Sequence, residues 1–220
     1  VSGSGFNFVP VMLGAVLLWD FFSRVMQGVT MAFFEDVWSR NFLNVFATPL
    51  HISEYVSGLV LASVSTSSVG LIAMLILATA VFGLSYFSIG WLLLLFLLVL
   101  FLFGIALGIM ATAMVLRMGP AAEWLVWPIP ALVSPFVGVF YPLSTLPSWM
   151  RVFSHLLPPS YVFEGLRALV LGKPLDVTSL FIGAALAIGY VAAASWLFYE
   201  TYKHALRTGL IARYSAESLS

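Results

Sequence analysis

Long apolar stretches alternate with short polar patches along this chain. No Asp, Glu, Lys or Arg occurs between Ser57 and Met114, and the run 92–108 is wholly apolar. A helix that crosses a bilayer needs about 20 consecutive apolar residues. The pattern therefore predicts an all-α, polytopic membrane bundle, formed by residues 1–220 as a single domain. Five spans are expected, at about 7–31, 55–82, 89–114, 121–141 and 178–202.

Two polar regions interrupt this pattern. The connector 35–54 mixes apolar and polar residues and ends near Pro49, which suits a short helix on the membrane surface. It is either a simple interfacial turn or a helix that docks on a cytoplasmic partner. The region 142–176 is too polar to span, and Pro158 and Pro159 divide it into two short helices at about 147–156 and 160–171, with Ser160 as the N-cap of the second. We expect this pair to be re-entrant or interfacial.

Three prolines interrupt the fourth predicted span, at positions 128, 130 and 135. Proline removes a backbone donor and breaks the helical hydrogen-bond pattern, so neighbouring protein must satisfy the freed carbonyls inside a membrane. The fourth span is therefore expected to be a broken helix.

The basic residues predict an orientation. Six of them fall on the side of the connector and the C-terminal tail, namely Arg24, Arg40, Arg117, Lys203, Arg207 and Arg213, and three on the other side, namely Arg151, Arg167 and Lys173. The positive-inside rule makes the first side, with the C-terminus, cytoplasmic. Five spans that end inside begin outside, so we expect a further transmembrane helix before Val1 and an N-terminally truncated chain.

Composition excludes several classes of function. The net charge is zero, which argues against nucleic acid as a partner, and the absence of cysteine excludes thiolate chemistry. The three histidines show no metal-ligand spacing, so no metal site is predicted. No convincing catalytic set is present, and an intramembrane enzyme is disfavoured.

Two pairs of residues within the spans suggest helix contacts. Asp20 and Arg24 share a helix face and can pair; they stand near the far end of the first span, where a structural ion pair is favoured over a functional one. Gly104 and Gly108 form a G-x-x-x-G motif that permits close helix packing, either within the chain or between copies.

The order of these segments resembles the permease subunit of ABC-2-type exporters. Two local matches carry the resemblance, residues 46–50 (FATPL) in the connector and residues 157–172 (LPPSYVFEGLRALVLG) before the last span. The resemblance implies six helices in the full protein, a homo- or heterodimer of permeases in the membrane lipid, and a cytoplasmic ABC ATPase subunit. ATP and Mg would bind to that partner, and this chain would bind no cofactor and be no enzyme.

The resemblance also implies roles for residues. The connector would be the coupling helix, through Arg40, Asn41, Asn44, Phe46, Thr48 and Pro49. The module 142–176 would be an extracytoplasmic gate on the substrate path, through Trp149, Tyr161, Glu164 and Arg167. Glu164 and Arg167 stand three apart and are alternatively a purely structural pair.

The expected function is export of an amphipathic substrate (a lipid, lipid-linked saccharide, polysaccharide or drug) across the bacterial inner membrane. The alternative is a stand-alone secondary transporter or channel. Such a protein would favour ionisable residues near mid-membrane, and the second, third and fifth predicted spans have none in their interiors.

Overall fold

The computed structural model describes residues 8–39, 49–82 and 90–208. Within these ranges every element is helical, which confirms the predicted all-α bundle. In chain order the elements are α1 (Phe8–Trp38), α3 (Ile52–Phe82), α4 (Trp91–Met118), the 3-10 helix η2 (Pro120–Leu125), α5 (Ile129–Val137), the 3-10 helix η3 (Leu143–Thr145), α6 (Ser148–Ser154), α7 (Pro158–Val170) and α8 (Val177–Thr208).

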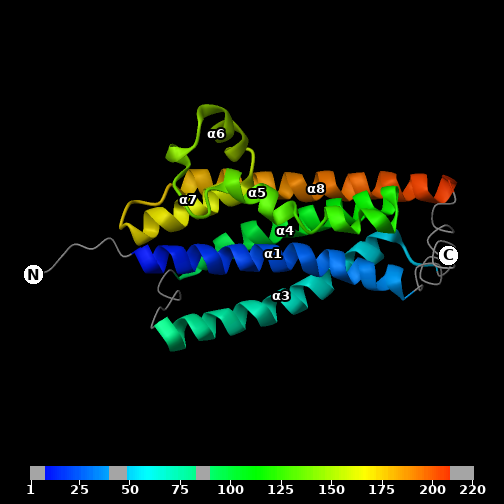
Figure 1. Cartoon of the computed structure of the whole chain (residues 1–220), viewed down its shortest axis with the longest axis horizontal. Helices are drawn as coiled ribbons and strands as arrows, with labels where there is room; N and C mark the ends of the chain where they lie inside the picture. Colours follow the sequence, from blue (N-terminus) through cyan, green and yellow to red (C-terminus); the bar gives the residue numbers. More distant parts are fainter. Residues whose placement is uncertain (1–7, 40–48, 83–89, 209–220) are drawn as a thin grey trace, which may run out of the picture.

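The four long helices α1, α3, α4 and α8 lie along the long axis of the molecule, and α6 projects from its side (Figure 1). The C-terminal ends of α1, α4 and α8 lie at the same end as the start of α3. Among the described residues, three helices are long and apolar enough to cross a membrane: α3 over Ile52–Ala80, α4 and α8. Helix α1 has 31 residues but carries four acidic or basic side chains.

Helix α4 forms the centre of the bundle because it is apolar around its whole circumference. It packs against α1 on one side and α8 on another. Small residues allow the close approach: a Cβ added at Gly104 would lie 2.8 Å from Val25 Cγ1 of α1, and one added at Gly108 would lie 2.7 Å from Val29 Cβ. Both glycines of the predicted motif therefore serve helix packing within the chain.

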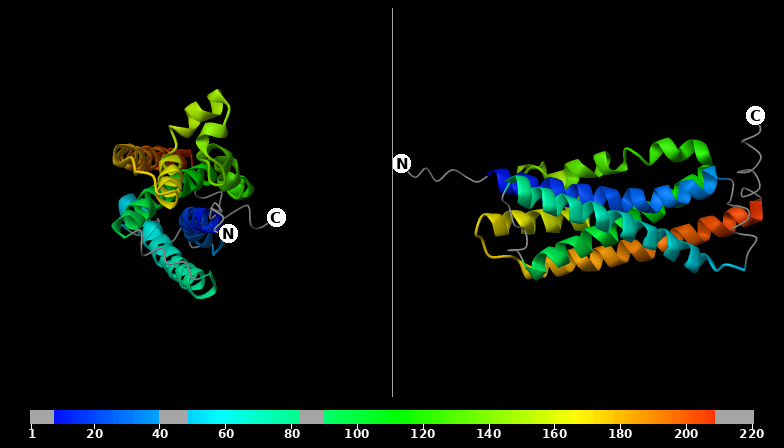
Figure 2. Two further views of the ribbon diagram at one scale, coloured as in Figure 1. Left: turned by 90° about the vertical axis from the view of Figure 1, so that its left-hand side faces the viewer. Right: turned by 90° about the horizontal axis from the view of Figure 1, so that it is seen from below.

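Helix α3 lies at the edge of the bundle and contacts α1 (Figure 2). The Ser63 hydroxyl, which is fully buried, donates a hydrogen bond to the Val25 carbonyl of α1 at 2.7 Å. Large apolar side chains cover the outer face of α3, and Val69 and Ile72 are each more than half exposed. Such an apolar face is suited to contact with lipid tails.

The fourth predicted span is divided into η2 and α5. Helix α4 ends at Gly119, whose positive φ of 97° favours glycine, and Pro120 begins η2. Helix α5 has only nine residues, or about 14 Å at 1.5 Å per residue, which is about half of the hydrocarbon core. It ends at Gly138, which is left-handed with φ 65°. The chain therefore does not cross as a single helix over this range.

Candidate functional site

A partly buried ion pair fastens α7 to the turn that follows α5. Arg167 donates to Glu164 Oε1 at 2.6 Å, and its second terminal nitrogen donates to the carbonyls of Gly138 at 2.8 Å and Tyr141 at 3.0 Å. Glu164 Oε1 also accepts the Leu143 amide at 2.9 Å. The pair thus satisfies backbone groups that the broken fourth span leaves free, which is the compensation that a membrane requires.

Burial and charge act in opposite directions on Arg167. Desolvation lowers the pKa of its guanidinium, and the neighbouring Glu164 carboxylate raises it. The ordinary arginine pKa lies so far above neutrality that the side chain stays charged. The hydrogen bonds to the turn therefore come from a charged donor at neutral pH.

The four residues predicted for the outer gate do not share one hollow. Tyr161 and Glu164 line a hollow of about 290 Å³ between α7 and the start of α8, and Tyr161 donates to the His155 carbonyl at 2.8 Å. Trp149, which is 60% exposed, lines a different, apolar groove of about 490 Å³ between α5 and α6. Its ring packs edge-on against Phe136 at 6.4 Å. Arg167 lines neither hollow.

The capping of α7 differs from the prediction. The helix begins at Pro158, with both prolines in its first turn, so Ser160 is not its N-cap. The Ser160 hydroxyl is buried and donates back to the carbonyls of Ser154 at 2.7 Å and Leu157 at 2.8 Å. It therefore joins the end of α6 to the start of α7.

Asp176 caps the start of α8. Its carboxylate accepts the Ser179 hydroxyl at 2.5 Å and the Ser179 amide at 3.2 Å. These hydrogen bonds hold the pKa of Asp176 below its ordinary value. Asp176 lines the same hollow as Glu164, so two acidic side chains border that hollow.

The predicted coupling residues lie mostly outside the described residues. Arg40, Asn41, Asn44, Phe46 and Thr48 fall in the range 40–48, and Pro49 is exposed. The end of α1 and the start of α3 flank this range, and both are hydrogen-bonded within the bundle.

Three hydrogen bonds tie these helix ends. Tyr55 near the start of α3 donates to Asp36 Oδ2 near the end of α1 at 2.9 Å. Trp38 Nε1, at the last residue of α1, donates to Glu123 Oε2 of η2 at 3.2 Å. The His51 amide donates to Glu54 Oε2 at 2.8 Å and so caps α3. The first two of these hydrogen bonds link the end of α1 to α3 and to η2.

Sequence reasoning missed this set of contacts. Asp36, Tyr55, Trp38 and Glu123 belong to no motif. The spacing of helix ends along the sequence cannot indicate which of them meet. A polar side chain close to each predicted helix end was the available signal.

The ion pair of α1 lies deeper than predicted. Arg24 Nε donates to Asp20 Oδ2 at 2.5 Å, as the spacing predicts. Helix α1 continues to Trp38, so 14 residues, about 21 Å, separate Arg24 from its end. The neighbouring Val25 packs on Gly104, which lies at the midpoint of α4 between Trp91 and Met118. The pair therefore stands near mid-membrane and not near the surface.

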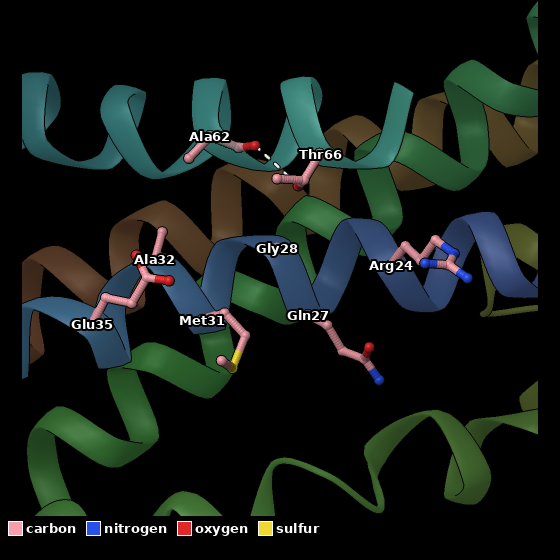
Figure 3. A pocket seen from close by; sticks show the side chains of 8 residues that line it. All are labelled: Arg24, Gln27, Gly28, Met31, Ala32, Glu35, Ala62 and Thr66. Atoms are coloured by element: carbon pink, nitrogen blue, oxygen red, sulfur yellow. Dashed lines mark hydrogen bonds between the residues drawn. The ribbon is translucent and has the colours of Figure 1, made fainter. Parts of the chain in front are cut away.

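A groove of about 290 Å³ runs between α1 and α3 beside this pair. Figure 3 shows Arg24, Gln27 and Glu35 from α1 and Thr66 from α3 along it. The side chains of Asp20 and Arg24 remain 32% and 49% exposed. This face of α1 thus carries charged side chains that lie near mid-membrane and are still exposed. Within the described parts of the chain, no cluster of acidic or histidine side chains suits a metal ion.

The comparison with protein families identifies the chain. The model of the ABC-2 type transporter family matches residues 2–171. The chain therefore belongs to the ABC-2 type transporter family, and it is a membrane permease domain of ABC type. The match covers residues 46–50 and all but the last residue of 157–172, the two segments that carry the resemblance in the sequence. No match was found among curated proteins.

Proposed function

We propose that this chain is the membrane subunit of an ATP-driven exporter in the bacterial inner membrane, with its C-terminus in the cytoplasm. It moves an amphipathic substrate outward, whether lipid, lipid-linked saccharide, polysaccharide or drug. A separate ABC ATPase subunit binds ATP and Mg, and a second permease copy completes the path. One observation supports this proposal most strongly: a member of the ABC-2 family has both ends of its connector tied to the helix bundle.

The proposed coupling mechanism follows from those ties. The ATPase binds residues 40–49, and ATP-dependent closure displaces them. A partner shifts a membrane equilibrium only through contacts that differ between two states. The hydrogen bonds of Asp36 with Tyr55 and of Trp38 with Glu123 carry the displacement to three helices at once. A loosely attached connector would absorb the same motion.

The proposed orientation is supported by the placement of basic residues. Arg117 near the end of α4 and Lys203 and Arg207 near the end of α8 lie at the end of the bundle where α1 ends. Arg167 and Lys173 belong to the module near the opposite end. An excess of basic residues favours the cytoplasmic side.

The proposed outer gate consists of α6 and α7. The Glu164–Arg167 pair joins α7 to the turn after α5, so α7 and this turn move as one body. Trp149 on the apolar groove and Tyr161 on the polar hollow offer two surfaces of different character to an amphiphile. In this scheme Arg167 positions the gate, and Trp149 and Tyr161 contact the substrate.

A stand-alone secondary transporter is the second candidate, and the Asp20–Arg24 pair near mid-membrane favours it. Transporters of that class use intramembrane ionisable residues for ion coupling. The two functions differ in their energy source. Transport that persists without an ATPase partner identifies the second candidate.

Co-purification tests the proposal. The full-length permease is isolated from native membranes alongside two variants, Asn44→Asp with Phe46→Asp in the connector, and Val152→Asp on the exposed face of α6 as the matched control. We expect a P-loop protein with ATPase activity to accompany the parent and the control, and to be lost from the connector variant. Absence of any ATPase from an intact permease preparation contradicts the proposal.

A further inference from the structure

The ion pair of α1 presents a physical difficulty in lipid. A charged side chain at the centre of a bilayer is costly, so such residues face the interior of a bundle or water. Arg24 and Asp20 do neither within the described residues, because their side chains are 49% and 32% exposed on the outside of α1. The contact of Val25 with the middle of α4 excludes a position at the membrane surface.

The polar character continues along the same side of α1. The polar side chains of α1 that line the groove recur at helical spacing, with Gln27 one turn after Arg24 and Glu35 two turns beyond Gln27; Met31 lies between the last two on the same face. Thr66 of α3 completes the opposite wall. A helix face in contact with lipid tails would instead resemble the outer face of α3, where Val69 and Ile72 are exposed. The face of α1 is therefore adapted to water and polar groups.

The geometry of Arg24 specifies what this face can bind. Asp20 holds the guanidinium through Nε, and this is the hydrogen bond that the side chain makes within the described chain. The terminal nitrogens retain their donors. Gly70 of α3 leaves room for the arginine stem, since a Cβ there would lie 3.1 Å from Arg24 Cδ. A guanidinium whose Nε is bonded to a carboxylate still has N–H donors on its two terminal nitrogens. These donors match two oxygens of a phosphate or carboxylate.

We propose that the face of α1 bearing Asp20, Arg24, Gln27 and Glu35 is the wall of a water-accessible track for the head group of the transported amphiphile. Arg24 binds anionic head-group oxygens, and Asp20 positions it. This inference rests on the proposed export function and narrows its substrate to an amphiphile with an anionic, oxygen-bearing head. The track lies between α3 on one side and η2 with α5 on the other, with α4 behind α1 (Figure 2).

Thiol labelling tests the track, since the sequence has no cysteine of its own. Gln27→Cys places a reporter beside Arg24, Thr66→Cys provides a second reporter on α3, and Val69→Cys is the control on the lipid face near the same depth. Only a thiolate in water reacts with charged methanethiosulfonates. In membrane vesicles we expect both reporters to react at least about tenfold faster than the control. If the two reporters react as slowly as Val69→Cys while the protein is folded, the proposed track is overturned.

The charge of the reagent tests the role of Arg24. In the Gln27→Cys background, Arg24→Gln removes one positive charge one helical turn from the reporter. We expect the anionic reagent to react about sixfold more slowly and the cationic reagent about sixfold faster, so that the rate ratio of the anionic over the cationic reagent falls about thirtyfold, as for a unit charge about 8 Å away in an effective dielectric near 40. Dodecyl phosphate should slow labelling, whereas dodecyltrimethylammonium should not, and Arg24→Gln should abolish this protection. An unchanged ratio, or equal protection by both amphiphiles, overturns the anionic head group.

The two proposals fail separately. Labelling requires neither ATP nor an ATPase partner, so unreactive reporters leave the exporter function standing. If the reporters react but no ATPase co-purifies with the protein, the water-accessible track stands and ATP hydrolysis by a partner subunit is excluded as the energy source.

Discussion

The Arg167 network allows a quantitative prediction about the outer module. Replacing Arg167 with methionine keeps the length of the side chain and removes its charged hydrogen bonds to the carbonyls of Gly138 and Tyr141. Each such bond contributes about 1.5 kcal/mol at the lower end of the range for charged donors. Glu164 is 42% exposed, so water rehydrates the carboxylate and its loss of a partner adds little. The expected cost of opening the turn is therefore about 3 kcal/mol.

Hydrogen exchange measures this cost locally. A reduction of about 3 kcal/mol in the free energy of opening accelerates exchange about 150-fold. Amides of the turn provide the signal, since Leu143 donates to Glu164, Thr145 to Pro142 and Leu146 to Leu143. We expect this acceleration in peptides covering 138–146 when the Arg167→Met permease is compared with its parent in nanodiscs.

The control removes a charge elsewhere. Lys203 lies 3.5 Å from Glu200 in an exposed pair on α8, so Lys203→Met should leave the exchange of 138–146 unchanged. An acceleration below about fivefold in Arg167→Met would show that the turn is held by its own backbone and not by the arginine. An equal acceleration in Lys203→Met would show a general loosening and also refute the reasoning.

Two further predictions concern packing and capping. Gly108→Ala places a Cβ 2.7 Å from Val29 Cβ, so it should destabilise the α1–α4 contact by about 1–3 kcal/mol. Gly189→Ala is the control, because a Cβ there has nothing within 4 Å and should not destabilise the protein. Thermal unfolding in detergent compares the two variants. For Asp176, the lowered pKa means that its carboxylate stabilises the start of α8 fully above about pH 4, and the effect is lost as pH falls through the folded pKa. Ser179→Ala should raise that pKa, so protection of the α8 amides should weaken at a higher pH than in the parent.

Part of this architecture follows from the sequence through simple physics. The apolar runs predict the all-α membrane bundle because lipid admits little else. The spacing of Asp20 and Arg24 and of Glu164 and Arg167 predicts both ion pairs, because neighbours on one helix face meet whatever the fold.

The remainder depends on where helices stop and which of them meet. Helix α1 continues past the predicted end at residue 31 to Trp38, because no proline or glycine ends it there, and this moves Arg24 towards mid-membrane. The hydrogen bonds of Arg167 to Gly138 and Tyr141 join residues more than 25 positions apart, which no local pattern encodes. Trp149 and Tyr161 are close in the sequence, yet the turn between α6 and α7 places them on different hollows.

Site-specific photo-crosslinking tests the central claim, that this permease takes its energy from a cytoplasmic ATPase at the connector. A photoreactive phenylalanine replaces Phe46 in the connector or, as the matched control, Trp149 in α6, and each permease is irradiated in native membranes. The account predicts that position 46 forms a crosslink to a P-loop ATPase and that position 149 forms none. A crosslink to the ATPase from position 149, or none from position 46 in an active transporter, would contradict it.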